Sequence, residues 1–82
     1  MEAKKGLIVR SKAGRDKGGI FVILELENEY AYITDGNLRK VDRPKKKKLR
    51  HLQLSGFEIK LDLTAEISDR KVREALAEYS EN

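Results

Sequence analysis

Residues 6–26 read GLIVRSKAGRDKGGIFVILEL, two apolar stretches joined by a loop rich in glycine and cations. In the first stretch Leu7 and Val9 recur with the two-residue period of a β-strand. The second stretch, residues 20–27, is apolar along one whole face and on both faces at its beginning. Such a profile suits a sheet curled into a small barrel, whose inner face is core and whose outer face is partly covered by another element. The pattern therefore predicts two strands of a small barrel.

The next part of the chain continues this alternation. Residues 30–35, YAYITD, predict a third strand after a hairpin turn at 27–28. Gly36 and Asn37 both tolerate positive φ, so they predict the following turn. Residues 38–41 then predict a fourth strand.

A connection and two more strands are expected after that. Pro44 has no backbone donor and the four lysines behind it repel one another, so residues 43–48 predict an exposed connection. A strand resumes over 49–54. The run FEIKLDL at 57–63 alternates without a fault, which predicts an added C-terminal strand.

A short helix is expected at the C-terminal end. Ser68 can accept the first free amides of a helix, and Asp69 favours the positive end of its dipole. An apolar stripe follows at helical spacing, formed by Val72, Leu76 and Tyr79. The core face of the second strand would consist of Ile20, Val22, Leu24 and Leu26. We therefore expect the helix, over 69–79, to dock on the opposite face of that strand, over Phe21 and Ile23.

The length of 82 residues suits one small domain with a modest core. We expect a single domain over 1–82, with a five-stranded barrel over about 5–56 and the added strand and helix over about 57–80. The chain has no cysteine, its longest purely apolar run is IFVIL, and its opening MEAKK lacks the apolar segment of a signal peptide. These features predict a cytoplasmic protein that is a monomer when free and has no membrane partner.

The positive charge is concentrated in one part of the sequence. Residues 36–57 hold eight Lys/Arg against one acidic residue, whereas residues 1–35 hold six against six and residues 58–82 hold four against seven. A concentrated positive field attracts polyanions, so nucleic acid is the expected partner and an anionic membrane the weaker candidate. A solvated, lysine-rich surface with no ligand is the alternative.

The loop at 11–19, SKAGRDKGG, is suited to binding an anion. Its glycines let backbone amides approach a phosphate, and its cations supply charge: Lys12, Arg15 and Lys17. The glycines could also serve only to turn a tight corner between two strands. A nucleotide-binding P-loop is excluded, because Ile20 and Phe21 stand where that motif needs its lysine and hydroxyl, and because the loop leads into a strand.

The stretch GLIVRSKAGRDKGGIFVI resembles the KOW motif, a strand-loop-strand unit of ribosomal proteins and transcription elongation factors. The positions that carry the match are Gly6, Val9, Gly14, Lys17 and Gly18. The segments SKAGRDKG, TDG and LRHLQL are similar to the archaeal and eukaryotic type of large-subunit ribosomal protein fourteen and to short free-standing bacterial KOW proteins. The resemblance covers about residues 5–63 and departs from the usual pattern at Gly19 and Phe21. It implies an SH3-like five-stranded barrel that binds RNA, usually ribosomal RNA, at the loop residues Lys12, Gly14, Arg15, Lys17 and Gly18.

The second basic segment, RKVDRPKKKKLRH, is the strongest functional signal in the composition. It contributes the further candidate RNA-binding residues Arg39, Lys40, Arg43, Lys45, Lys46, Lys47, Lys48, Arg50 and His51. Lysines suit phosphates without geometric demands, and arginines can make forked contacts or stack on unpaired bases. The segment could also be a loop that is ordered only on RNA. We expect it to lie beside the loop at 11–19, so that the two form one surface.

The remaining aromatic and reactive residues add little chemistry. Tyr30 and Tyr32 share a strand face and could stack on bases, although core packing is the commoner role of aromatic residues. Phe21 and Phe57 are assigned to packing. The serines lack a plausible base, and we see no metal or cofactor site and no small-molecule substrate, so the chain is predicted not to be an enzyme.

The expected function is RNA binding in the translation apparatus, through phosphates of structured RNA. The main alternative is a protein-interaction module that docks on RNA polymerase, a ribosomal protein or a translation factor. Weak, nonspecific DNA binding is a third possibility. The RNA-binding and protein-binding roles differ in whether a partner is retained after digestion by nuclease.

Overall fold

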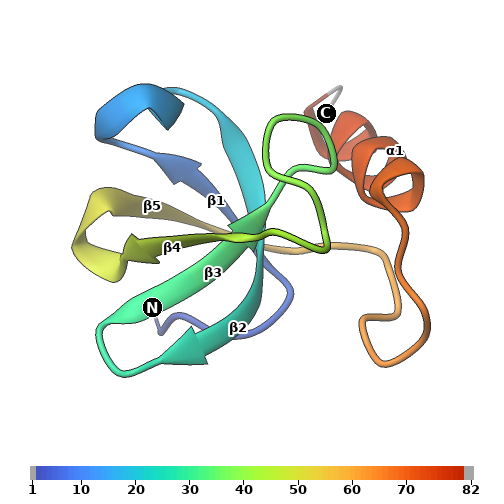
Figure 1. Cartoon of the computed structure of the whole chain (residues 1–82), viewed down its shortest axis with the longest axis horizontal. Helices are drawn as coiled ribbons and strands as arrows, with labels where there is room; N and C mark the ends of the chain where they lie inside the picture. Colours follow the sequence, from blue (N-terminus) through green and yellow to red (C-terminus); the bar gives the residue numbers. More distant parts are fainter. Residues whose placement is uncertain (1, 81–82) are drawn as a thin grey trace.

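The computed structural model describes residues 2–80 and consists of a five-stranded antiparallel sheet followed by one helix (Figure 1). The elements are β1 (Leu7–Ser11), the 3-10 turn η1 (Gly14–Asp16), β2 (Ile20–Glu27), β3 (Tyr30–Thr34), β4 (Lys45–Lys48), the 3-10 turn η2 (Leu49–His51), β5 (Leu52–Glu58) and α1 (Asp69–Ser80). The order across the sheet is β4-β3-β2-β1-β5, so β4 and β5 are its edges. The mostly β class and the C-terminal helix are confirmed. No helix within residues 2–80 has both the length and the apolar character needed to cross a membrane.

The fourth strand lies further along the chain than predicted. Residues 38–41 are not a strand, and part of the supposed exposed connection, Lys45–Lys48, is β4, paired with β3 from Ile33↔Lys45 to Tyr30↔Lys48. Lysines are tolerated there because β4 is an edge strand, where charge also blocks pairing with other chains. The side chain of Lys47 points inward and is only 9% exposed.

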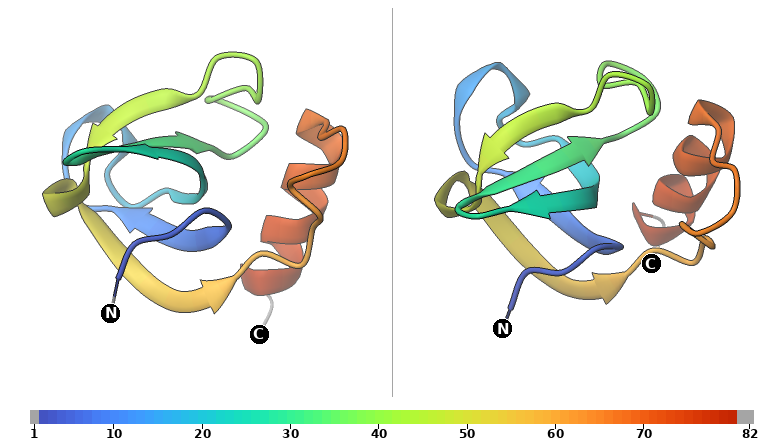
Figure 2. Two further views of the ribbon diagram at one scale, coloured as in Figure 1. Left: turned by 90° about the horizontal axis from the view of Figure 1, so that it is seen from below. Right: turned by 60° about the horizontal axis from the view of Figure 1, so that its bottom comes forward.

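The added C-terminal strand at 57–63 was predicted wrongly. After the turn of η2, strand β5 runs from Leu52 to Glu58 and ends there. Leu7, the first residue of β1, pairs with Glu58, so β1 offers almost nothing beyond that point for a longer β5 to pair with. Residues 59–68 are an irregular connection to α1 (Figure 2).

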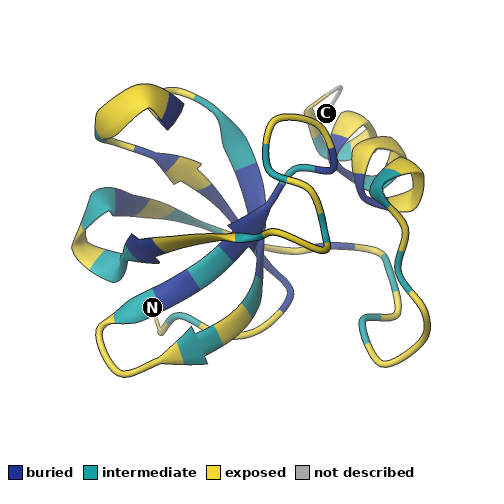
Figure 3. Ribbon diagram, in the orientation of Figure 1, coloured by how far each residue is buried: buried dark blue, intermediate teal, exposed yellow. Residues whose placement is uncertain are grey.

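The curved sheet has apolar residues on both faces, which form two clusters. The first lies on the face away from α1 and contains Leu7, Val9, Phe21, Ile23, Ala31, Ile33 and Leu52. The second lies between the sheet and α1 and contains Ile8, Val22, Ile59, Val72 and Leu76. Figure 3 shows buried residues along the middle of the strands and on the side of α1 that meets the sheet. The helix therefore covers one face of the sheet and completes the second cluster.

The face on which α1 docks was predicted wrongly. The helix packs over Ile8 and Val22, whereas Phe21 and Ile23 lie in the cluster on the opposite face. Both faces of β2 are apolar at its beginning, so its own residues do not distinguish them. Phe21 pairs with Val9, and both side chains lie in the first cluster, on the face away from α1. A register irregularity between Ile23 and Glu25 then moves Leu26 to the first cluster.

The start of α1 is confirmed, and it is tied to the loop at 35–44. The Ser68 hydroxyl accepts a hydrogen bond from the backbone N–H of Lys71 at 3.2 Å. The Asp69 carboxylate accepts one from the N–H of Val41 at 2.7 Å, and Arg73 donates one to the Gly36 carbonyl, also at 2.7 Å. The loop after β3 is thereby held against the helix.

Gly36 should be the glycine least tolerant of substitution. Its φ is +74°, and an added Cβ would overlap the Asp69 carbonyl oxygen and lie 3.1 Å from Cγ of Arg73. We expect Gly36→Ala to lower the free energy of unfolding by about 2 kcal/mol or more and the melting temperature by about 10 °C or more. Gly18→Ala is the control, because φ there is +90° but nothing lies within 4 Å of the added Cβ. If thermal unfolding showed the same loss of stability in Gly36→Ala and Gly18→Ala, overlap of the added Cβ with Asp69 would not be the cause.

Candidate nucleic-acid interface

The loop between β1 and β2 is held by its own hydrogen bonds. The backbone of Ser11 donates to the Gly19 carbonyl at 3.0 Å and accepts from the N–H of Gly18 at 2.8 Å. The Arg10 guanidinium donates to the Gly18 carbonyl at 2.6 Å. The side chains of Lys12, Arg15 and Lys17 are exposed around this frame. The loop therefore presents its cations from an ordered backbone.

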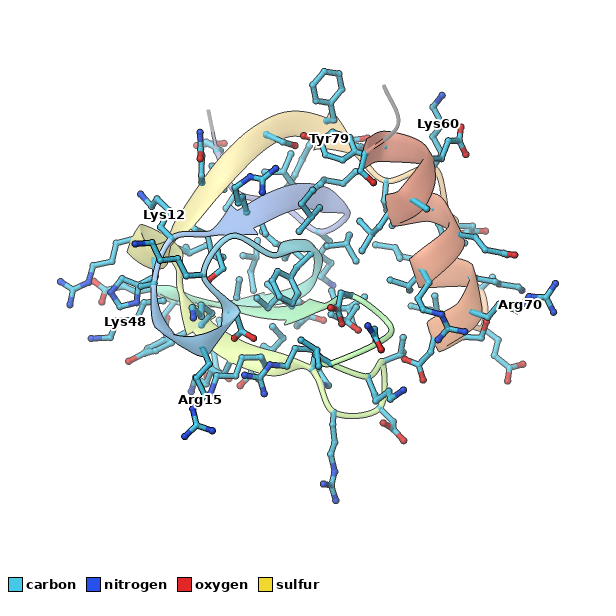
Figure 4. All side chains as sticks on the ribbon, turned by 90° about the horizontal axis from the view of Figure 1, so that it is seen from above. Lys12, Arg15, Lys48, Lys60, Arg70 and Tyr79 are labelled. Carbon is cyan, nitrogen blue, oxygen red and sulfur yellow. The ribbon has the colours of Figure 1, made fainter. Side chains whose placement is uncertain are left out.

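The loop and the second basic segment lie side by side, as predicted. The Lys12 N–H donates to the His51 carbonyl at 2.8 Å, and the Lys47 ammonium donates to the Ala13 carbonyl at 2.7 Å. Figure 4 shows Lys12, Arg15 and Lys48 together at one end of the molecule, whereas Arg70 and Tyr79 of α1, and Lys60 near that helix, lie toward the other. We call the first region the basic end and define it by Lys12, Arg15, Lys17, Lys48, Arg50 and His51.

Asp16 pairs with two of the predicted RNA-binding cations. Its buried carboxylate accepts two hydrogen bonds from the Arg39 guanidinium, at 3.1 and 3.0 Å, and lies 3.7 Å from the Lys47 ammonium. The side chain of Arg39 is 29% exposed and that of Lys47 only 9%. Lys47 joins the loop to β4 and Arg39 joins it to the loop at 35–44, and neither side chain is highly exposed. Asp16 was not among the predicted site residues, and its signal in the sequence is that it is the single acidic residue of the loop at 11–19.

Lys46 is also engaged, on the outer face of β3 and β4. Its ammonium lies 4.7 Å from the ring centroid of Tyr30, 6.0 Å from that of Tyr32 and 3.0 Å from the Glu27 carboxylate. The hydrogen bond with Glu27 raises the pKa of Lys46 above its usual range. The two tyrosines are half-buried on the outside of the sheet, so they are not core residues, and Lys46 covers them. Lys45 is exposed on the same strand.

Two predicted cations lie away from the basic end. Lys40 and Arg43 are exposed on the loop at 35–44, which is anchored to α1 through Gly36 and Val41. The glycines Gly14 and Gly18, by contrast, belong to the loop at the basic end and both have positive φ. The fourteen predicted residues thus separate into the basic end with its glycines, the pair bound to Asp16, the outer face of β4, and the loop beside α1.

His51 lies where the two basic segments meet. Partial burial is the largest cause that lowers the pKa of His51, and the nearby charges of Arg50, Lys47, Lys48 and Lys12 lower it further. These effects favour the neutral form of the imidazole, which has several cations nearby. An anion bound among those cations would reverse this electrostatic effect.

Phe57 was assigned to packing, and the structure contradicts this. Its side chain is 62% exposed, and its ring centroid lies 5.6 Å from that of Tyr79 at an interplanar angle of 58°. Phe21, in contrast, is 1% exposed within the first cluster, as predicted.

Comparison of the sequence with models of known protein families gives no match, and neither does comparison with curated proteins. The function of this chain therefore has to be inferred from the geometry of the basic end.

Proposed function

We propose that this chain is a non-enzymatic RNA-binding module of the translation apparatus, working in the cytoplasm, with ribosomal RNA as its partner. We further propose that the curved sheet is an SH3-like barrel of the KOW type, in which the loop between β1 and β2 is the KOW loop. RNA is contacted through backbone phosphates at the basic end. The module recognises the shape of folded RNA rather than a base sequence.

The observation that carries the proposal is the convergence of two separately encoded sets of cations on one end of the sheet. Lys12, Arg15 and Lys17 come from the loop between β1 and β2, whereas Lys48 and Arg50 come from the second basic segment. The backbone hydrogen bond from Lys12 to His51 joins the two segments. The carboxylate of Asp16, the one acidic residue of the loop, is buried and already paired with Arg39 and Lys47. A phosphate chain that lies across this end can therefore meet cations from both segments without passing an exposed carboxylate of the loop.

Affinity for RNA as a function of salt concentration tests the proposal. The wild-type protein is titrated into a fluorescently labelled RNA hairpin with a single bulged uridine, and fluorescence anisotropy gives the affinity at several salt concentrations. We expect a linear log-log plot whose slope corresponds to about 0.7–0.9 per phosphate contact. A flat plot, or no binding, would overturn the proposal. Competition with duplex DNA at the same salt concentrations distinguishes RNA recognition from nonspecific binding to polyanions.

His51 should make this binding depend on pH. Phosphates beside the imidazole favour its charged form, so we expect RNA to raise the pKa of His51 from its depressed value in the free protein. Binding then takes up a proton, and the affinity increases as the pH falls from 7 through the pKa of the bound state. NMR titration of the His51 ring protons with and without the hairpin measures this shift.

The variant His51→Gln is the control and should remove the pH dependence while keeping most of the salt dependence. A His51 pKa that is unchanged by RNA would place the phosphate chain away from this side chain. In the free protein the sign is also defined: because folding lowers the pKa of His51 below its unfolded value of about 6.5, the folded state becomes less stable as the pH falls from that value through the lower pKa of the folded state.

A further inference from the structure

A groove with an aromatic wall lies between the sheet and the C-terminal turn of α1. One hollow of about 270 Å³ is lined by Arg10, Ile20, Phe57, Tyr79 and Ser80. A second of about 220 Å³ shares Arg10, Ile20 and Tyr79 and extends along β5 past Gln53 and Ser55. We call this region the aromatic groove and define it by Arg10, Ile20, Gln53, Phe57 and Tyr79.

Phe57 reaches this groove because the pairing of β1 with β5 is irregular. Leu7 pairs with Glu58 and Val9 pairs with Leu54, so three residues of β5, 55–57, stand opposite the single residue Ile8. A bulge of this kind changes the direction of a side chain, and bulges are common beside functional sites. The Ser55 hydroxyl accepts a hydrogen bond from the Phe57 N–H at 3.0 Å, which holds the bulge. The ring is thereby presented to solvent against Tyr79 rather than to the core.

Arg10 connects the aromatic groove to the basic end. Its side chain lines the groove, and its guanidinium donates to the Gly18 carbonyl in the loop that carries Lys12, Arg15 and Lys17. The groove and the loop therefore meet at Arg10, although Tyr79 and the loop cations lie toward opposite ends of the molecule. A ligand with both an apolar planar part and a negatively charged chain can use the groove and the basic end together.

We propose that the aromatic groove binds an unpaired nucleobase of the same RNA whose backbone lies on the basic end. This inference rests on the proposed function. The base stacks on the ring of Phe57 and lies against Tyr79 and Ile20, while Arg10 meets the adjoining phosphate. An apolar side chain of a protein would fill the same space but would leave the guanidinium without an anion, which is why the arrangement favours RNA.

The test compares Phe57→Ala with Leu38→Ala on two RNA hairpins. Leu38 is the matched control, because it is the other large exposed apolar residue within residues 2–80, at 75% against 62%, and it lies on the loop beside α1. The hairpins have the same closing loop and differ only in the stem, which has the bulged uridine in one RNA and is fully paired in the other. We expect Phe57→Ala to weaken binding of the bulged hairpin by about 5- to 150-fold with an unchanged salt slope, because the variant removes stacking and keeps every phosphate contact. Leu38→Ala should leave both affinities unchanged.

The two hairpins separate failure of this inference from failure of the proposed function. If the wild type binds both RNAs with a salt slope but Phe57→Ala changes neither affinity, base binding is overturned while the proposed function stands. If Phe57→Ala weakens both hairpins equally, binding of the bulged base is also overturned. If the wild type binds neither RNA, the proposed function fails as well.

A readout on the wild type covers the case in which Phe57→Ala does not fold. The ring protons of Phe57 and Tyr79 should shift upfield on addition of the bulged hairpin and not on addition of the paired one, because a stacked base shields them. Equal shifts with both hairpins, or none, would contradict the proposal.

Discussion

Replacing Lys12, Arg15 and Lys17 together by glutamine is expected to lower the affinity for the bulged RNA hairpin by roughly 50- to 150-fold at about 0.15 M salt. The three side chains are exposed on one loop at the basic end. Each phosphate that the variant no longer neutralises should reduce the log-log salt slope by about 0.7–0.9, so the slope should fall by about 2 to 3. Anisotropy titrations at several salt concentrations measure both quantities on the same samples.

A variant with the same change in net charge elsewhere is the control. Lys40, Arg43 and Lys71 are also exposed cations, and they lie on the loop beside α1 and on α1 itself. Their joint replacement by glutamine removes the same three charges but should leave the slope almost unchanged. An equal loss of affinity in both triple variants would mean that net charge alone attracts the RNA, which contradicts a localised interface.

Melting temperatures distinguish the functional role of this loop from a purely structural one. The three replaced side chains are exposed, and substitutions of such residues usually change stability by less than about 0.5 kcal/mol. We therefore expect the loop variant to melt within a few degrees of the wild type. A variant that fails to fold would indicate that the loop cations serve the turn rather than the RNA.

The strands that could be predicted from the sequence are those whose own residues carry the signal. In β1, β2 and β3, β-branched and aromatic residues alternate between turns, so each strand is encoded locally. The four lysines of β4 show no alternation, and the inward direction of Lys47 depends on Asp16, which is distant in the sequence. The alternation of FEIKLDL predicted a wrong strand for the opposite reason. Because β1 begins at Leu7, only one further backbone hydrogen bond forms beyond Glu58, from the Ile59 N–H to the Gly6 carbonyl.

For the candidate site, the sequence predicts where charge gathers but not how the cations are divided. The two basic segments were expected to meet, and the hydrogen bond from Lys12 to His51 joins them. The engagement of Arg39 by Asp16 is a tertiary contact, as is that of Lys46 with Glu27 and the tyrosines. The exposure of Phe57 results from a bulge, which binary patterning does not reveal. What could not be predicted therefore depends on pairing register and on carboxylates from other strands and loops.

Asp16→Ala is expected to destabilise the fold more than replacement of any exposed cation at the basic end. The carboxylate is 4% exposed and is the partner of both the Arg39 guanidinium and the Lys47 ammonium. Its removal leaves Lys47, which is 9% exposed, as a buried charge with only the Ala13 carbonyl. Breaking a buried pair in this way costs about 3–5 kcal/mol, which for a domain of this size lowers the melting temperature by about 15 °C or more.

A double-mutant cycle with Lys47 isolates the origin of this destabilisation. Lys47→Met keeps the length of the side chain and removes the ammonium, and Asp16 then retains its two hydrogen bonds from Arg39. We expect this single variant to be destabilised by less than Asp16→Ala, and the double variant Asp16→Ala/Lys47→Met to be more stable than Asp16→Ala alone, because no buried ammonium is left unpaired. Urea unfolding of the four proteins gives the coupling free energy. Additive effects would instead mean that the cost of Asp16→Ala comes from the loop backbone and from Arg39, and that Lys47 reaches solvent when its partner is removed.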